Sequence, residues 1–426
     1  MSIIVRRPID ERLLLEHMIR KRDYAGNLTY VSAYKEQDSQ RVSFPLCSAL
    51  KHGFTPKLHK TAQRKAWDFK GTFRSPEQSA AFDAALKYLN DSHACILSLH
   101  VGFGKTFLAL KLAAHIGLKT LIVVPTSKKV LQCQWHDEIL RFMPDARVEL
   151  LSSKSVLGDD CASDIFIASA HCVSKIWKKL TFIPFVIVDE LHLVLSPKGF
   201  HCLLHLFPFF LLGLSATPYR LDGSNELVEL FFGKAQVEKK LKRDYLVRVI
   251  QTAFKFKIHK TEKGKLNWGA ILSEQANHEQ RNRRIAQIVC ENRGTKFLIL
   301  CKCVDQIKIL AQNCREGGVA VQAVYEDISP VKDERTLIGT VKKLGTGFSD
   351  SSFKGLIIAA DVQDYFIQYF GRVLRDPADC PVIYDIVDDN HVMCKHFKAR
   401  REIYVESGGK LEIIAETSLE STASSS

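Results

Sequence analysis

The sequence predicts an α/β protein with two parallel β-sheets in series, preceded by an N-terminal accessory segment. Short apolar runs alternate with amphipathic helical stretches from about residue 94 onward, and the same rhythm restarts after about residue 290. The runs are continuously apolar, which is typical of strands that are covered by helices on both faces. A chain of 426 residues is long enough for two or three domains of this kind.

Ten apolar runs are expected to form the buried strands of these sheets. They are Ala94–Leu99, Thr120–Val124, Asp164–Ala168, Phe185–Val188 and Phe210–Leu214 in the first sheet, and Lys296–Leu300, Val319–Val324, Leu337–Thr340, Leu356–Ala359 and Val382–Ile386 in the second.

The domain boundaries follow from the same pattern. We expect the accessory segment at residues 1–70, the α/β domains at 71–235 and 236–402, and a tail at 403–426. The stretch between the two sheets, about 233–293, is charged and less patterned. The end of the tail is too poor in apolar residues to become ordered.

Composition limits the environment and the partners. Sixty Lys and Arg against 47 Asp and Glu leave a net charge of +13, which favours a polyanionic partner, although a basic protein without such a partner has the same balance. No apolar run approaches the ~20 residues that cross a bilayer. The N-terminus lacks the apolar stretch of a signal peptide, and no CxxC pair occurs among the cysteines. We therefore expect a soluble intracellular protein with no membrane partner.

A glycine-containing loop follows the first apolar strand. It reads Gly102, Phe103, Gly104, Lys105 and Thr106, and a helix over 107–115 comes next. Glycines let backbone N–H groups turn toward phosphate oxygens, and the helix N-terminus adds positive potential. The lysine is expected to reach the β- and γ-phosphates, and the threonine hydroxyl to hold Mg²⁺. The usual pattern has another glycine five positions before Gly104, where this chain has leucine, so a chance match in a tight turn is the alternative.

Two carboxylates follow the fourth apolar strand. Asp189 comes directly after Val188, at a strand end where a carboxylate can hold Mg²⁺ through its waters. Glu190 is expected to point elsewhere and to act as general base on an attacking water. His192 is a candidate link from the nucleotide to the next loop. The alternative is a solvated acidic turn.

These motifs together resemble the DExH-box helicases of superfamily 2, in the branch that contains XPB, UvsW and helicases of large DNA viruses. The box itself is Asp189-Glu-Leu-His192, and Phe73–Gln78 resembles the adenine-recognition motif, in which Gln78 reads the base edge. The stretch Gly213–Gly223 is the most specific to the branch. Further segments resemble motifs that contact the nucleic-acid strand: Val123–Thr126, Gln134-Trp135 and Ile167–Ala170.

The second domain carries two more segments of the family pattern. Ile338–Phe348 resembles motif V, with Ser349 inserted before Asp350. Gln368–Arg375 resembles motif VI, which implies that Arg372 and Arg375 face the γ-phosphate. An amphipathic helix with solvated arginines is the alternative for that segment taken alone.

The resemblance implies two tandem RecA-like domains, ATP with Mg²⁺, and an ATP-driven helicase that acts on nucleic acid, with DNA favoured over RNA. Three other functions stay open: a duplex translocase or annealing motor without strand separation, a nucleotide-dependent binding protein without hydrolysis, and a small-molecule kinase. Protein partners and oligomeric state have no signal in the sequence.

Overall fold

The computed structural model describes residues 1–415 except for 23–27, 126–128, 159, 197–198, 217–224, 258, 263, 265, 327, 329–335, 345–351 and 363–379. The chain forms two units, Met1–Lys240 and Leu241–Ser426. In these described stretches, no helix combines the length and the apolarity needed to cross a lipid bilayer.

The main sheet of unit 1 has seven parallel strands in the order β12-β6-β11-β10-β7-β9-β8. Their side chains alternate between two cores. Leu121 and Val123 of β7 face one core, whereas Ile122 and Val124 face the other. The strands are β6 (Ala94–Leu99), β7 (Thr120–Val124), β8 (Val148–Leu150), β9 (Ile165–Ser169), β10 (Phe185–Val188), β11 (Phe210–Ser215) and β12 (Gln236–Lys239).

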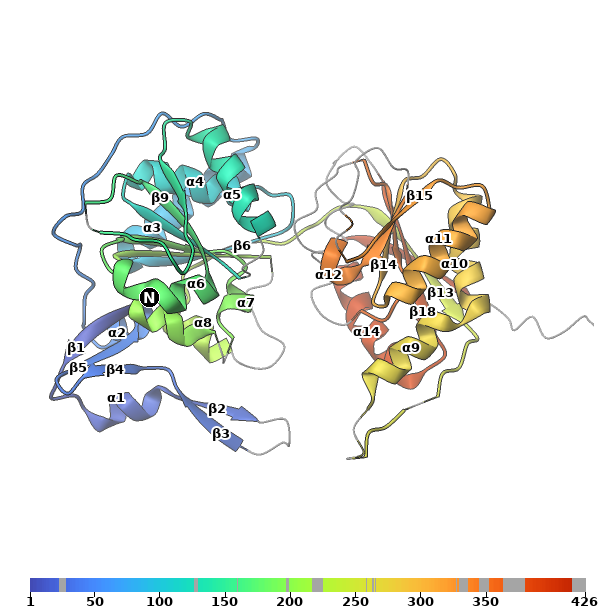
Figure 1. Ribbon diagram of the computed structural model, residues 1–426, viewed down its shortest axis with the longest axis horizontal. Helices are drawn as coiled ribbons and strands as arrows, with labels where there is room; N and C mark the ends of the chain where they lie inside the picture. The colour runs from blue at the N-terminus through green and yellow to red at the C-terminus, as the bar shows by residue number, and fades with distance from the viewer. Residues whose placement is uncertain are drawn as a thin grey trace, which may run out of the picture. The chain divides into compact units, whose positions relative to one another are not determined.

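Helices cover both faces of this sheet (Figure 1). One face carries α3 (Pro76–Ser92), α4 (Lys105–Ile116) and α5 (Lys129–Phe142). The opposite face carries α6 (Ala170–Ile176), α7 (Leu191–Val194), α8 (Asn225–Phe232) and the short 3₁₀ helix η2 (Phe200–His205), with η1 (Trp177–Lys179) following α6.

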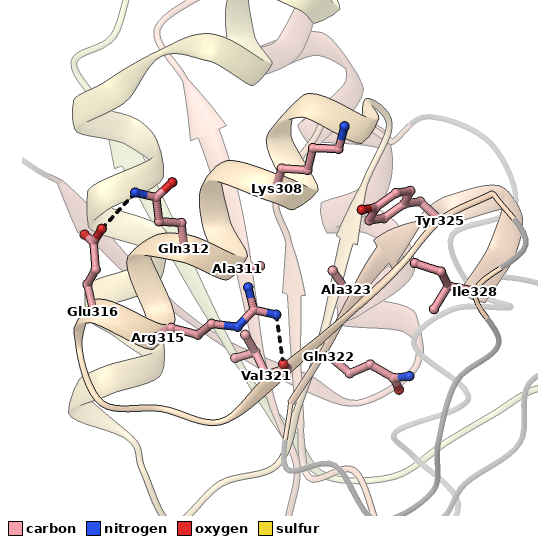
Figure 2. A pocket seen from close by; sticks show the side chains of 10 residues that line it. All are labelled: Lys308, Ala311, Gln312, Arg315, Glu316, Val321, Gln322, Ala323, Tyr325 and Ile328. Atoms are coloured by element: carbon pink, nitrogen blue, oxygen red, sulfur yellow. Dashed lines mark hydrogen bonds between the residues drawn. The ribbon is translucent and has the colours of Figure 1, made fainter.

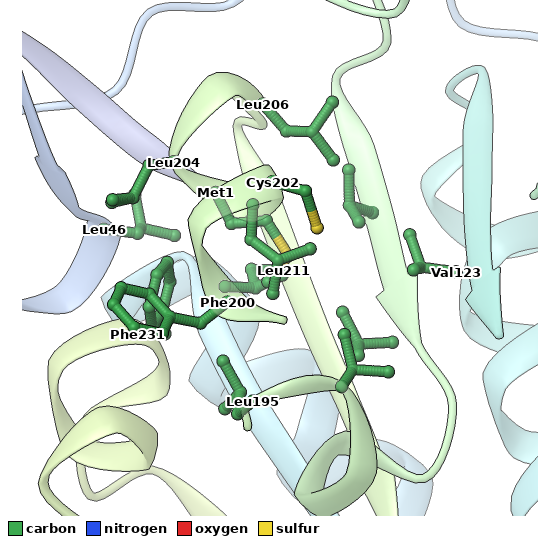
Figure 3. Packing of buried hydrophobic residues seen from close by; sticks show 14 of the residues in the cluster. Met1, Leu46, Val123, Leu195, Phe200, Cys202, Leu204, Leu206, Leu211 and Phe231 are labelled. Carbon is green, nitrogen blue, oxygen red and sulfur yellow. The ribbon is translucent and has the colours of Figure 1, made fainter. Parts of the chain in front are cut away.

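The first 51 residues form a small antiparallel layer that is part of unit 1. Its core is continuous with that of the main sheet, and Figure 3 shows Met1 and Leu46 packed beside Phe200, Leu204 and Phe231. The layer contains β1 (Ser2–Arg6), α1 (Glu11–Glu16), the hairpin β2 (Met18–Arg22) and β3 (Leu28–Ser32), β4 (Lys35–Asp38), β5 (Arg41–Pro45) and α2 (Leu46–Lys51).

Unit 2 contains a second parallel sheet of seven strands, in the order β15-β16-β14-β17-β18-β13-β19. The strands are β13 (Tyr245–Thr252), β14 (Phe297–Cys301), β15 (Val321–Val324), β16 (Thr336–Thr340), β17 (Gly355–Ile358), β18 (Val382–Asp388) and β19 (Gly409–Ala415). Helices α10 (Glu279–Glu291) and α11 (Val304–Glu316) pack on one face, and α12 (Val341–Leu344) and α14 (His391–Glu406) on the other. Helix α9 (Trp268–Asn277) lies against α11.

The two parallel sheets confirm the predicted fold class, and all ten predicted strands are present within a few residues of the expected bounds. The boundaries of the units differ from those expected. Strand β12 pairs with β6 of unit 1, so unit 1 extends beyond residue 235. Strand β19 pairs with β13, so residues expected in the tail complete the second sheet.

Candidate nucleotide-binding site

Three of the predicted segments meet at one edge of the unit 1 sheet. Neighbouring parallel strands bring their carboxyl ends together, and β11 lies between β6 and β10. The glycine loop follows β6, β11 ends at Ser215, and Asp189 follows β10. The fold therefore places the predicted phosphate loop and the predicted metal carboxylate two strands apart at the same edge.

The phosphate loop depends on glycine at two positions. Gly102 and Gly104 have φ angles of 87° and 103°, in the left-handed region that favours glycine. A Cβ atom at Gly104 would lie 2.5 Å from Nε2 of Gln78, so this position also lacks room for a side chain. Gly104 is the N-cap of the twelve-residue helix α4, whose first N–H groups have no partner within the helix. The loop is thus built as a cradle for an anion.

Lys105 bends back onto its own loop. Its Nζ donates a hydrogen bond to the carbonyl oxygen of Leu99 at 2.9 Å. Burial lowers the pKa of Lys105, an effect that the nearby carboxylates of Glu190 and Asp189 oppose. An ammonium group has three donors, so the bond to Leu99 leaves capacity for phosphate oxygens.

The two carboxylates of the DExH box have different surroundings. Asp189 Oδ1 accepts from the backbone N–H of Glu190 at 3.0 Å, and Oδ2 accepts from the indole Nε1 of Trp135 at 2.9 Å. Burial raises the pKa of Asp189, although these donors and Lys105 lower it. Glu190 has a left-handed backbone, with φ of 45°, and its Oε2 lies 3.6 Å from Nδ1 of His192. The strained turn therefore directs adjacent carboxylates to different partners.

His192 joins the ends of β10 and β11. Its Nδ1 and the hydroxyl of Ser215 share a hydrogen bond of 2.9 Å, and the imidazole is fully buried. The contact connects the DExH box to the residue that precedes the next loop, whereas a link through His192 to the nucleotide stays a prediction. That loop begins with Ala216 and then passes outside the described residues at 217–224.

Gln78 lies against the phosphate loop. Its Nε2 donates to the carbonyl of Phe103 at 2.9 Å, and its Oε1 accepts from the backbone N–H of Arg74 at 2.8 Å. A cavity of about 380 Å³ opens beside it, within the range of about 300–1,000 Å³ for small-ligand sites. The cavity is lined by Gly71, Thr72, Arg74, Gln78, Gly104, Thr106, Phe107, Glu138, Arg141 and Phe142.

The residues at this edge suit a magnesium nucleotide. Asp189 and Thr106 offer a carboxylate and a hydroxyl, the hard oxygen ligands that Mg²⁺ prefers. The glycine cradle has N–H groups and an adjacent ammonium for phosphates, and the cavity has aromatic walls at Phe107 and Phe142 for a base.

Comparisons with known proteins identify the family. Residues 72–220 match the family described as "Type III restriction enzyme, res subunit". The chain is 36% identical over 369 residues to "Putative helicase 161L" of Invertebrate iridescent virus 6, covering 80% of this chain and 82% of that protein. It is 33% identical over 341 residues to "Putative helicase 055L" of Frog virus 3, with 78% of each covered. The chain belongs to the superfamily 2 helicases.

A solved structure agrees with this fold. S. cerevisiae Dbp5 bound to RNA and ADP BeF3 aligns over 80% of this chain and 94% of its own, with a TM-score of 0.55 and 14% identity. At that identity the likeness supports the tandem RecA-like architecture alone.

Several predicted motifs of this helicase lie outside the described residues. Arg372 and Arg375 of motif VI fall within 363–379, and motif V passes out of the described part after Leu344. The described residues of the site all belong to unit 1.

Two residues near the site were not assigned to it from the sequence. Arg74 Nη2 donates to the carbonyl of Gly102 at 3.0 Å, and Trp135 binds Asp189. The segment Gln134-Trp135 resembles a strand-contacting motif, and within it the Trp135 side chain is 4% exposed and packed in the core with Ile139. The sequence contains one signal for a role of Trp135 near the site: its position on the predicted helix that follows the strand-contacting segment Val123–Thr126.

Unit 2 has a larger cavity, of about 540 Å³, that none of the predicted site residues lines. Figure 2 shows it between helix α11 and strand β15, with Lys308 and Tyr325 at one end and Arg315 and Val321 at the other. Strand β15 is an edge strand, so this cavity is the groove between the last strand and the helix beside it.

Proposed function

We propose that this helicase couples ATP hydrolysis to translocation on DNA and to unwinding of DNA. The observation that carries the proposal is the convergence of Lys105, Thr106, Asp189 and Glu190 at one sheet edge, beside a cavity of nucleotide size. Binding modules that never hydrolyse nucleotide need the phosphate cradle, but they have no use for a second carboxylate directed away from the first.

Each residue has a proposed task. The loop N–H groups and Lys105 bind the phosphates, Thr106 and Asp189 hold Mg²⁺, and Gln78 recognises the base. The bound ion neutralises charge on the phosphate oxygens. Glu190 accepts a proton from the attacking water, since its carboxylate is not committed to the metal.

Two arginines of unit 2 are proposed to stabilise the negative charge on the γ-phosphate in the transition state. Arg372 and Arg375 belong to unit 2 in the sequence, and an arginine finger is worth on the order of 10³–10⁵ in turnover. A group that acts mainly in the transition state lowers turnover when removed, with little change in ATP affinity. Arg375→Ala and Arg372→Ala should therefore retain ATP binding and lose hydrolysis.

Strand contacts are proposed to run mainly through phosphates. The net charge of +13 favours a polyanion, and phosphate contacts carry no sequence information. DNA is preferred over RNA on the resemblance to helicases of large DNA viruses.

The test is ATP hydrolysis measured in parallel without polymer and with single-stranded, duplex and forked DNA and RNA, together with strand displacement on the fork. We expect stimulation by DNA and displacement of the fork. Lys105→Ala should abolish hydrolysis without altering thermal unfolding, whereas Lys87→Ala, an exposed lysine on α3, should match the parent. Stimulation without displacement would indicate a translocase or annealing motor, and hydrolysis by Lys105→Ala would refute the phosphate-loop assignment.

A further inference from the structure

Trp135 makes a contact that is unusual for a core tryptophan. Its ring is 4% exposed and packs among apolar side chains of α5 and the sheet, yet its Nε1 donates to Oδ2 of Asp189 at 2.9 Å. The Trp135 side chain has one polar atom, Nε1, and this atom donates to Asp189, the predicted metal ligand.

This bond helps to fix the orientation of the carboxylate. The other oxygen of Asp189 accepts from the backbone N–H of Glu190 at 3.0 Å, so each oxygen has one protein donor. A carboxylate has about four lone-pair sites, which leaves acceptor sites for the water shell of a metal. Donors behind a metal-binding group set its orientation, and losing one typically costs about 10–100-fold in metal affinity or activity.

We propose that Trp135 is a positioning residue for the metal site: its indole N–H holds Asp189 in the orientation that binds Mg²⁺ with nucleotide. The proposal rests on the proposed function of this edge as a magnesium-nucleotide site. It also gives helix α5 a direct connection to that site, because Trp135 lies in the second turn of α5. The helix begins at Lys129, shortly after Val123–Thr126, the segment predicted to contact the strand.

Two substitutions separate the donor from the apolar ring. Trp135→Phe keeps an aromatic body but has no N–H. Trp135→His loses the six-membered ring but can present its Nε2–H where the indole Nε1–H lies, because the two five-membered rings share their geometry. Trp177→Phe is the matched control, since Trp177 stacks on His205 with ring centroids 4.0 Å apart and has no part in the site.

The readout is binding of a fluorescent ADP analogue to the full chain as Mg²⁺ is titrated, which requires no turnover. Mg²⁺ should increase the affinity for the ADP analogue. In Trp135→Phe, the Mg²⁺ concentration that gives half of this increase should be about 10–100-fold higher than in the parent. Trp135→His should stay within a few-fold of the parent while losing thermal stability, and Trp177→Phe should match the parent. A folded Trp135→Phe protein with parental Mg²⁺ dependence would overturn the proposal.

A measurement on the parent covers the case in which Trp135→Phe does not fold. The chain has four tryptophans and hence four indole N–H resonances. With ADP bound, adding Mg²⁺ should shift one of them strongly, and the absence of any shift would also overturn the proposal. If the parent binds magnesium nucleotide in this way but shows no polymer-dependent hydrolysis, the proposed function fails while the role of Trp135 stands.

Discussion

Both units carry acidic and basic side chains at or near the carboxyl ends of their parallel strands, but the two sets have different partners. In unit 1, Lys105 binds a backbone carbonyl and Asp189 accepts from an indole and a backbone N–H. In unit 2, Arg400 donates through Nε and Nη2 to both oxygens of Asp385, at 2.9 and 2.8 Å. Lys105 and Asp189 of unit 1 thus form hydrogen bonds with neutral groups, whereas Arg400 and Asp385 of unit 2 neutralise one another.

A second ion pair of unit 2 follows the same rule. Arg281 Nε lies 2.9 and 3.1 Å from the oxygens of Asp388, and both side chains are fully buried. Arg281 also donates to the carbonyl of Ala359 at 2.6 Å, which ties α10 to the end of β17. A charged residue at a strand end is therefore a ligand candidate when its protein partners are neutral, and a structural residue when an opposite charge encloses it.

The largest expected effect of a substitution is the loss of ATP turnover when a carboxylate of unit 1 is changed. Glu190→Gln keeps the shape of the side chain but removes the proton acceptor, so hydrolysis should fall about 10²–10⁴-fold. Binding of ATP with Mg²⁺ should persist, because the proposed metal ligand is Asp189. Single-turnover hydrolysis and ATP dissociation constants, measured with single-stranded DNA bound, check both expectations.

Asp137→Asn is the control for Glu190→Gln. Its side chain is 79% exposed on α5, so the loss of its charge should leave the rate unchanged. Parental turnover in Glu190→Gln would mean that another group takes the proton, and the two carboxylates of the box would no longer have separate tasks.

Most of the strands that could be predicted are buried on both faces, since burial leaves a continuous apolar run such as Phe185–Val188. Strand β13 was missed because Arg248 and Gln251 interrupt its apolar pattern. Strand β19 was missed because Lys410 and Glu412 interrupt its apolar pattern and none of its residues is buried. In both cases the pairing that makes the strand is provided by residues more than 100 positions away.

The residues of the site also divide into those that the sequence predicts and those that it does not. The phosphate loop and the carboxylates are local patterns, because their chemistry requires fixed spacing within a few residues. The bond between Trp135 and Asp189 joins residues 54 positions apart, and no spacing rule indicates it. Arg281 is the opposite case, since its basic run, Arg281-Asn-Arg-Arg284, reads as a charged surface, but the fold buries the first arginine with Asp388.

The next effect is on the stability of unit 2. Arg400→Met should leave Asp385 buried without its cation, which costs about 3–5 kcal/mol of unfolding free energy. Urea titration followed by hydrogen exchange of peptides from β18 and α14 measures it. Arg283→Met is the matched control, because Arg283 and Glu279 form a pair that is 71% exposed on each side and is worth at most about 0.5 kcal/mol.

Adding Asp385→Asn to Arg400→Met should recover part of the loss, since it removes the unpaired charge. If Arg400→Met instead left stability unchanged and impaired ATP turnover, the charges of unit 2 would be catalytic and the contrast between the units would fail.

The smallest expected effect is a loss of stability at acidic pH in the N-terminal layer of unit 1, which contains a buried neutral histidine where unit 2 has buried ion pairs. His17 is fully buried; its Nδ1 donates to the carbonyl of Leu13 at 2.6 Å, and the hydroxyl of Ser48 donates to its Nε2 at 2.7 Å. Only the bond from Ser48 requires the neutral ring, because a protonated imidazole still donates from Nδ1 but cannot accept at Nε2. Burial lowers the pKa of His17 below its ordinary value of 6.5.

The direction in which stability changes with pH follows from the number of protons bound by the folded and unfolded states. Between the lowered pKa of folded His17 and the ordinary value in the unfolded chain, the unfolded state binds more protons, so stability increases with pH. Unit 1 should therefore lose stability as pH falls below about 6.5, the ordinary value of the histidine pKa. Urea midpoints from pH 7.5 to 5, followed by hydrogen exchange of β1 and β5, should show this slope in the parent. His17→Gln should reduce this slope, with the remainder due to other buried histidines such as His205, whose pKa is lowered to about 4 by burial. His171→Gln, at an exposed residue on α6, should leave the slope unchanged. An unchanged slope in His17→Gln would assign the acid sensitivity of this layer to other groups.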